Sequence, residues 1–306
     1  MKKIILTVFI LQLISFITQA QSFETLTYYQ DDTTKLELDL FLPENATTEN
    51  IPLVIFVHGG GFSGGNRGGG HNIGKFLAPK GYAVASITYT LYMKGKNFSC
   101  GGILTEKVKA IQIAANQLWL ATGFLLENAK KYKFNPEEVF VAGSSAGAET
   151  VLHAIYWDYA TMKMYDKPLP ENFRYAGLIS GAGAMMDVNL ISKETQIPSM
   201  FFHGNSDPVV PYGTAAHHYC KTNASGWLML FGSYSIYNRM LDLNGDVDLI
   251  THCGGKHEIA SKHFHEMQEP VYAFLEKVRK GIHFQTHTIL ATDNAAASPP
   301  EYSFCK

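Results

Sequence analysis

Three short runs of the chain are almost entirely apolar, and longer segments with helical periodicity separate them. The runs cover residues 53–57, 82–87 and 139–142. An unbroken apolar run of this length is typical of a strand buried on both faces, which occurs where helices cover both sides of a parallel sheet. The sequence therefore predicts an α/β fold, with a mostly parallel sheet between two layers of helices.

The remaining chain continues this alternation of strands and helices. Leucines alternate with polar residues over 35–42, which predicts a half-exposed strand. We expect one domain over 21–306, with a loosely packed tail after about residue 282. Further strands are expected at 176–179, 200–203 and 247–251, and helices at 105–133, 146–159, 212–221, 232–243 and 261–280, with Pro270 starting or kinking the last.

The first twenty residues have the features of an export signal. Lys2 and Lys3 precede a largely apolar run over 4–17, and small residues lie at the cleavage positions that end at Ala20. The run is shorter than the roughly 20 residues that span a bilayer, which disfavours an uncleaved anchor. We therefore expect residues 1–20 to be a signal peptide, and the mature protein to be secreted or periplasmic with no membrane span.

The four cysteines lie in the predicted mature protein: Cys100, Cys220, Cys253 and Cys305. An even number in an oxidising compartment predicts two disulfides, although free buried thiols are the alternative. Sequence spacing leaves all three pairings open. The absence of a C-x-x-C pair disfavours zinc.

Composition excludes some classes of function. The chain has 306 residues, 46% of them hydrophobic, with 25 Lys and Arg against 27 Asp and Glu. A disordered chain would have lower hydrophobicity and a higher net charge. A nucleic-acid partner is not expected, because the sequence has no basic run to neutralise phosphates. The oligomeric state is open.

Ser145 stands at the centre of a G-x-S-x-G motif at 143–147. The motif lies between the predicted strand at 139–142 and the predicted helix that follows. In this strand–turn–helix setting the motif is the nucleophile elbow, which exposes the serine hydroxyl at the edge of the sheet. Ser145 is therefore the candidate nucleophile.

A glycine-rich loop follows the strand at 53–57 and begins His58-Gly59-Gly60-Gly61. Consecutive glycines allow backbone N–H groups to face a cavity, as an oxyanion hole requires. We expect Gly60 and Gly61 to form this hole together with the N–H of Ala146, which comes directly after the nucleophile. His58 is expected to brace the loop.

An acid and a histidine follow two later strands. Asp207 comes shortly after the strand at 200–203, and His257 follows the strand at 247–251. The chain order Ser145, Asp207, His257 is that of the α/β-hydrolases. Asp187, which follows another strand, is the reserve candidate for the acid.

A second group of histidines needs a separate interpretation. His263 and His265 follow His257 and Glu258, but the spacing of these residues is not H-E-x-x-H. A metal site is therefore disfavoured. We expect His263 and His265 to lie on a solvated helix face.

Four motifs together resemble a known family. The chain is similar to α/β-hydrolases of the carboxylesterase type, near the hormone-sensitive-lipase-like and the feruloyl or acetyl-xylan esterase branches. The resemblance implies a mostly parallel eight-stranded sheet with helices on both faces and no metal or organic cofactor. The motifs are H-G-G-G at 58–61, G-S-S-A-G at 143–147, H-G-N-S-D at 203–207 and G-G-K-H at 254–257.

The expected function is that of a secreted serine esterase. It would hydrolyse carboxylic esters through an acyl-enzyme on Ser145, with short-acyl, aromatic or carbohydrate esters as small-molecule or polymer-borne substrates. Two alternatives remain. One is a serine peptidase of the prolyl-oligopeptidase type, and the other is a non-catalytic binding module on the same fold.

Overall fold

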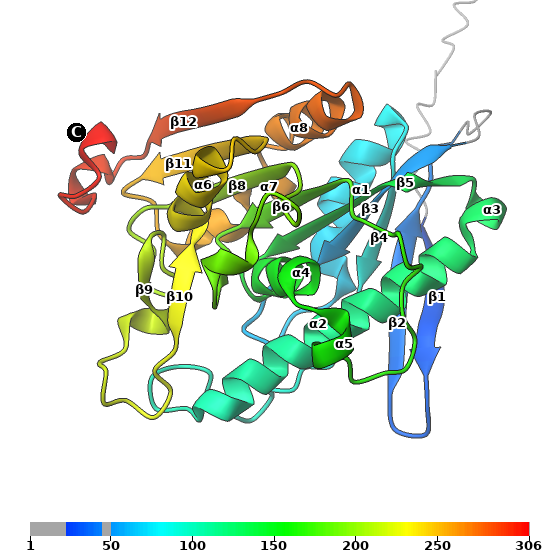
Figure 1. The fold of residues 1–306 in the computed structure, drawn as a ribbon, viewed down its shortest axis with the longest axis horizontal. Helices are drawn as coiled ribbons and strands as arrows, with labels where there is room; N and C mark the ends of the chain where they lie inside the picture. Colours follow the sequence, from blue (N-terminus) through cyan, green and yellow to red (C-terminus); the bar gives the residue numbers. More distant parts are fainter. Residues whose placement is uncertain (1–22, 45–49, 306) are drawn as a thin grey trace, which may run out of the picture.

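The computed structural model describes residues 23–44 and 50–305, and the predicted signal peptide lies outside them. Within these residues a nine-stranded sheet runs through the molecule, with helices on both faces (Figure 1). Its strands are β1 (Phe23–Gln30), β2 (Lys35–Phe41), β3 (Ile51–Val57), β4 (Ala83–Ile87), β5 (Phe134–Ser144), β6 (Gly177–Gly181), β8 (Ser199–Gly204), β11 (Val247–Cys253) and β12 (Gln285–Ala291).

The spatial order of the strands is β1-β2-β4-β3-β5-β6-β8-β11-β12. All strands from β4 to β12 in this order run parallel, while β1 and β2 pair antiparallel at one edge. The carboxyl ends of the parallel strands therefore meet at one side of the sheet, where polar side chains from different strands can come together.

The sheet has one strand more than the eight that the resemblance implied. The additional edge strand β12 lies in the tail that we expected to pack loosely, and it pairs with β11 from Val247↔Gln285 to Cys253↔Ala291. Its side chains are mostly exposed. The backbone of the tail is thus part of the sheet, although the tail adds little to the core.

Two layers of helices cover the sheet, and side-chain alternation along β3 shows how. Leu53, Ile55 and Val57 belong to the core under α2, α4 and α6, whereas Val54 and Phe56 belong to the core under α1, α7 and α8. The helices are α1 (His71–Leu77), α2 (Leu104–Glu127), α3 (Ala129–Tyr132), α4 (Ala146–Tyr156), α5 (Tyr159–Met162), α6 (Ser233–Asp242), α7 (Lys262–His265) and α8 (Glu269–Arg279).

Helix ends differ from the expectations where local chemistry interrupts the pattern. The helix expected at 261–280 is divided into α7 and α8, and Pro270 lies in the first turn of α8. The helix expected at 105–133 ends at Glu127, and the short α3 follows it.

The helix expected at 212–221 is wrong. This segment contributes to a small three-stranded sheet of order β7-β10-β9 and then makes a 3-10 turn, His217–Tyr219. His218 and Tyr219 have φ values of 56° and 52°, in the left-handed region that stops a right-handed helix. The strands of the small sheet are β7 (Ala184–Met185), β9 (Thr214–Ala216) and β10 (Met229–Gly232).

Two disulfides resolve the pairings that the sequence left open. Cys100 is bonded to Cys220, and Cys253 is bonded to Cys305. The first joins the loop before α2 to the turn after β9, and the second joins the end of β11 to the tail.

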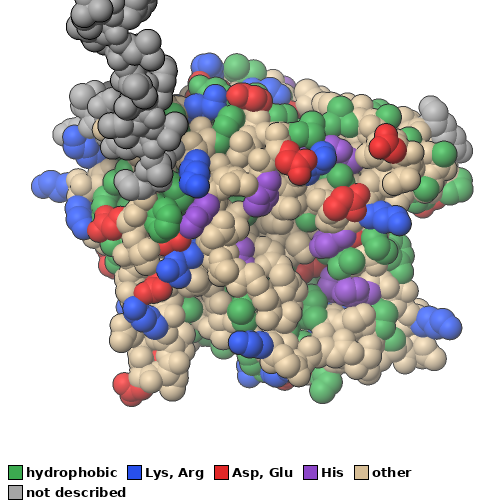
Figure 2. Space-filling view, turned by 180° about the vertical axis from the view of Figure 1, so that it is seen from behind, with side chains coloured by type: hydrophobic (Ala, Val, Ile, Leu, Met, Phe, Trp, Pro, Cys, Tyr) green, Lys and Arg blue, Asp and Glu red, His purple; other side chains and the backbone are tan. Residues whose placement is uncertain are grey.

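In the part of the chain that the structure describes, none of the helices combines the length and apolar character needed to cross a membrane. On the face seen in Figure 2, side chains of Lys and Arg are interspersed with those of Asp and Glu. That face carries no single extended patch of one charge.

Candidate active site

The backbone at Ser145 forms the sharp turn that the motif predicts. Ser145 lies between β5 and α4 with φ 53° and ψ −121°, and its N–H donates to the carbonyl of Gly181 at 2.8 Å. A Cβ atom at Gly147 would lie 2.0 Å from the carbonyl oxygen of Val57. The motif therefore needs glycine at 147 because helix α4 starts directly against the end of β3.

The three predicted strand-end residues form one hydrogen-bonded chain. The Oγ atom of Ser145 lies 2.8 Å from Nε2 of His257, and Nδ1 of His257 lies 2.7 Å from Oδ2 of Asp207. His257 begins the 3-10 turn His257–Ser261 after β11, and its side chain is 28% exposed. His257 is thus open to a cavity on one side and held by a carboxylate on the other.

The carboxylate of Asp207 is buried and fully hydrogen-bonded. Its Oδ1 accepts from the N–H groups of Val209 at 2.7 Å and Val210 at 3.1 Å. Its Oδ2 faces Nε2 of His203 at 3.2 Å as well as His257. Burial alone would raise the pKa of Asp207, but hydrogen bonds and charges from His203 and His257 outweigh it and hold the pKa well below its usual range.

Sequence reasoning gave no role to His203. Its Nδ1 lies 2.9 Å from the Ser233 hydroxyl, so the ring is fixed from both sides between β8 and α6. A histidine four residues before the acid, in an otherwise apolar strand, was the available signal. Its effect on Asp207 depends on a fold that brings both side chains to the same strand end.

The backbone conformation of the glycine-rich loop after β3 requires glycine at position 60. Gly60 has φ +116°, and a Cβ there would lie 2.3 Å from the carbonyl oxygen of Gly64. The carbonyl of Gly60 accepts hydrogen bonds from Ser63 and Gly64. The N–H groups of Gly60 and Gly61 have no acceptor among the described residues. His58 is buried and stacks on Tyr89 with ring centroids 4.3 Å apart, so it supports the start of the loop.

These groups surround one cavity of about 850 Å³. Ser145 and His257 line it, as do Gly60, Gly61 and Ala146. The N–H of Ala146 is in the first turn of α4, where helix amides have no partner within the helix. The arrangement can hold a carbonyl oxygen beside backbone donors while the serine hydroxyl approaches its carbon.

The lining of the same cavity includes three polar side chains that the sequence analysis did not predict as part of the site: Glu149, His217 and His218. Glu149 lies on α4 one helical turn after the nucleophile, and the two histidines lie on the turn after β9. The signal for Glu149 was an acidic residue on the inner face of an otherwise apolar helix. The two histidines gave none, because their position depends on pairing across the small sheet.

Asp187 is not at the site. It is exposed, and its carboxylate caps the 3-10 turn Val188–Leu190 by accepting from the N–H of Asn189 at 2.9 Å. The acid beside His257 in the structure is Asp207, the first candidate.

The expected solvated position of His263 is wrong. Its ring is buried, with Nε2 2.9 Å from Nε2 of His252, and burial lowers the pKa of His263 to about 4. His265 lies at the surface, 2.9 Å from the amide of Asn72. A cluster of side chains able to hold a metal is absent from residues 23–44 and 50–305.

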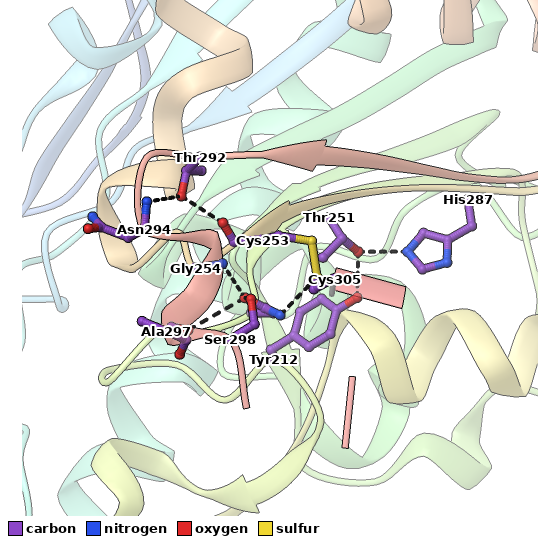
Figure 3. The surroundings of a disulfide bond; sticks show 12 residues. Tyr212, Thr251, Cys253, Gly254, His287, Thr292, Asn294, Ala297, Ser298 and Cys305 are labelled. Carbon is purple, nitrogen blue, oxygen red and sulfur yellow. Dashed lines mark hydrogen bonds between the residues drawn. A yellow bond between two sulfur atoms is a disulfide. The ribbon is translucent and has the colours of Figure 1, made fainter. Parts of the chain in front are cut away.

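Hydrogen bonds hold the tail close to the loops that carry Asp207 and His257. Oδ1 of Asn205 accepts from the N–H of Gly254 at 2.7 Å and from the Ser298 hydroxyl at 3.2 Å. Its side-chain amide donates to the sulfur of Cys305 at 3.2 Å. Figure 3 shows the tail segment packed around the disulfide to Cys253 at the end of β11. One asparagine next to the acid loop thus connects that loop, the segment before His257 and the tail.

Comparisons with known proteins cover different parts of the chain. A family model described as BD-FAE matches residues 38–183. A protein of Oryza sativa subsp. japonica, named probable isoprenylcysteine alpha-carbonyl methylesterase ICMEL1, is 30% identical over 42% of this chain and 30% of its own length. The fumonisin B1 esterase of Sphingopyxis macrogoltabida is 29% identical over 38% of this chain and 22% of its own length. The chain thus spans less than a third of the length of these curated relatives.

Solved structures match nearly the whole fold. Esterase 2 of Thermogutta terrifontis phosphorylated by paraoxon matches with a TM-score of 0.58 and 15% identity, covering 87% of this chain and 96% of that one. The propionate-bound form of the same esterase matches with a TM-score of 0.59 and 13% identity, covering 87% and 97%. Together with the sheet order and the elbow, these matches show that the chain has the α/β-hydrolase fold.

Proposed function

We propose that the protein is a serine esterase that hydrolyses carboxylic esters through an acyl-enzyme on Ser145. The single observation that carries the proposal is the hydrogen-bonded chain from Ser145 through His257 to Asp207 at the wall of the cavity. A serine hydroxyl is a poor nucleophile unless an adjacent base takes its proton, and this chain supplies one.

In the proposed mechanism each of the three residues has its own step. The hydroxyl of Ser145 attacks the ester carbonyl while its proton moves to Nε2 of His257. Asp207 holds the Nδ1 proton of the ring and stabilises the imidazolium that forms. His257 then gives the proton to the leaving alcohol, which departs with the bonding electron pair. Water attacks the acyl-enzyme in the same way and releases the acid and free Ser145.

The backbone provides the electrostatic part of the mechanism. Gly60, Gly61 and Ala146 line the same cavity as Ser145, and their N–H groups are the proposed oxyanion donors. In the tetrahedral intermediate they would donate to the oxygen that carries the negative charge. Loss of one such donor typically lowers turnover by about 10²–10³.

We infer that the substrates are esters with a short acyl chain or with an aromatic or carbohydrate group. A volume of about 850 Å³ is that of a site for a small molecule or the end of a polymer. Sequence relatives are named for a methyl ester and for fumonisin B1. Those names support an ester substrate. They do not define its acyl or alcohol group, which the experiment must identify.

The two disulfides support export to an oxidising compartment. If the proposed signal peptide is cleaved after Ala20, the mature chain begins at Gln21. Amino-terminal sequencing of the protein from the culture medium or periplasm tests this. A chain that retains Met1 would contradict it.

The catalytic proposal is tested with p-nitrophenyl acetate and p-nitrophenyl butyrate. The mature protein should hydrolyse both, and Ser145→Ala should abolish the activity while keeping the melting temperature of the wild type. Equal rates for the two proteins would refute the role of Ser145. Turnover of an aminoacyl-proline substrate but of no ester would favour the peptidase alternative, and no turnover of either would favour a binding module.

A further inference from the structure

Two buried polar side chains on the wall of the substrate cavity have atoms without a hydrogen-bond partner. They are Oε1 of Glu149 and Nδ1 of His217. Glu149 is 1% exposed and His217 is 2% exposed. A buried polar atom that lacks a partner costs about 1–3 kcal/mol, so two at one site need an explanation.

Both side chains line the cavity that contains Ser145. Glu149 is four residues after Ser145, and its N–H donates to the Ser145 carbonyl at 2.9 Å. Nε2 of His217 lies 3.5 Å from Oε1 of Glu149, without the alignment of a hydrogen bond. The two polar groups come from different elements and meet about one helical turn from the nucleophile.

The surroundings keep both groups uncharged near neutral pH. Burial raises the pKa of Glu149 to about 8, with Lys107 opposing the shift and Asp207 adding to it. Burial also lowers the pKa of His217 well below its usual value. The ammonium of Lys107 is itself buried and donates to the carbonyl of Gly226 at 2.8 Å, so it has its own partner. A protonated carboxyl beside a neutral imidazole offers both donors and acceptors to a ligand.

The walls of this region are held in place. The ring of Phe98 packs edge-on against His217, with centroids 5.2 Å apart. The disulfide between Cys100 and Cys220 joins the two loops that carry these rings. Val209, Val210 and Phe98 add apolar side chains to the lining of the cavity. The polar pair is therefore a preorganised feature of the wall.

We propose that Glu149 and His217 form a polar subsite that binds a hydroxyl group of the substrate a few bonds from the scissile ester. A hydroxyl both donates and accepts, so it can serve as the missing partner of a neutral carboxyl or of a neutral imidazole at this wall. The proposal rests on the proposed esterase function and gives it a substrate class: esters in which the acyl or the alcohol part carries a free hydroxyl. The apolar walls accept the carbon skeleton.

Two pairs of esters test the subsite from each side of the scissile bond. Methyl 3-hydroxybutyrate and methyl 3-methylbutyrate differ by a hydroxyl in place of a methyl in the acyl part. The pair 2-hydroxyethyl butyrate and propyl butyrate makes the same exchange in the alcohol part. We expect kcat/KM to favour the hydroxylated member of one pair by about tenfold or more, as for one well-made hydrogen bond.

Variants assign the preference to the named residues. Glu149→Leu and His217→Phe should each reduce the preference to about twofold or less, whereas Glu149→Gln, which keeps donor and acceptor, should retain most of it. Glu127→Leu is the matched control, because Glu127 is an exposed carboxylate at the end of α2. The readout is a ratio of rates on one preparation, so a loss of folded protein that affects both esters cancels. If Glu149→Leu does not fold, His217→Phe and Glu149→Gln carry the comparison.

The outcomes separate this subsite from the function on which it rests. If the wild type hydrolyses no ester, the esterase proposal fails. If it hydrolyses both members of each pair equally, or if Glu149→Leu and His217→Phe keep the preference, only the subsite fails. A preference for butyrylcholine over 3,3-dimethylbutyl butyrate, lost in Glu149→Leu, would show an ionised Glu149 and overturn the hydroxyl assignment.

Discussion

Asp207→Asn is the substitution whose effect the structure predicts in most detail. The two oxygens of Asp207 have different partners: Oδ1 accepts from the N–H groups of Val209 and Val210, and Oδ2 faces His257 and His203. The backbone donors cannot turn away, so the single oxygen of asparagine must remain with them. The amide NH₂ of the variant then points at His257.

That orientation reverses the proton arrangement of His257. An NH₂ group donates, so Nδ1 of His257 becomes an acceptor and the ring proton moves to Nε2, 2.8 Å from the Ser145 hydroxyl. A protonated Nε2 cannot take the serine proton. We expect kcat for p-nitrophenyl acetate to fall by about 10⁴, or about 5.4 kcal/mol in activation free energy.

The assay compares steady-state rates and thermal unfolding of the two proteins. Stability should fall by only about 1–3 kcal/mol, because the variant loses the charge but keeps the backbone contacts. Asp187→Asn is the control, since Asp187 is an exposed turn residue. Its rate should stay within threefold of the wild type. More than a tenth of wild-type activity in folded Asp207→Asn would refute the reasoning.

Three other outcomes follow from the geometry. Replacing both Cys253 and Cys305 by serine should lower the free energy of unfolding in urea by about 4 kcal/mol, from the 52-residue separation that the bond closes. Gly60→Ala should leave the protein folded but lower kcat by about 10²–10³, because its Cβ would meet the Gly64 carbonyl oxygen at 2.3 Å and displace the proposed oxyanion donors. The pKa of Glu149 is higher in the folded protein than the ordinary value for a glutamic acid. Its neutral carboxyl therefore contributes stability at a pH below that ordinary value, and this contribution is lost as the pH rises through about 8. The melting temperature of Glu149→Gln should therefore rise relative to that of the wild type as the pH is raised from 5 to 9. The difference in melting temperature between Glu127→Gln and the wild type should show no such trend.

The sequence predicted the strands that are buried on both faces because short unbroken apolar runs are typical of such strands. It missed β1 and β12, since an edge strand with exposed side chains lacks that pattern. The helix expected at 212–221 was wrong because two left-handed residues, His218 and Tyr219, interrupt the segment. Periodicity does not report such backbone conformations.

Some residues of the candidate site could likewise be predicted from the sequence, and others could not. Ser145, Asp207 and His257 could be predicted because each follows a strand, and the ends of parallel strands meet. His203 and His217 could not be predicted as parts of the site. Their contacts with Asp207 and Glu149 depend on where the strands and the turn after β9 are placed in space.

The two disulfides also close two separate covalent rings along the chain. The bond between Cys100 and Cys220 closes a ring that contains Ser145 and Asp207, and the bond between Cys253 and Cys305 closes another that contains His257. A single cut in 233–246 would therefore give two pieces that each contain a closed ring, held together by the pairing of β8 with β11, by hydrogen bonds such as those of Asn205 and Asp207, and by side-chain packing. Ser145 and Asp207 would remain on one piece and His257 on the other. Reassembly of two such pieces would restore the site without remaking any covalent bond.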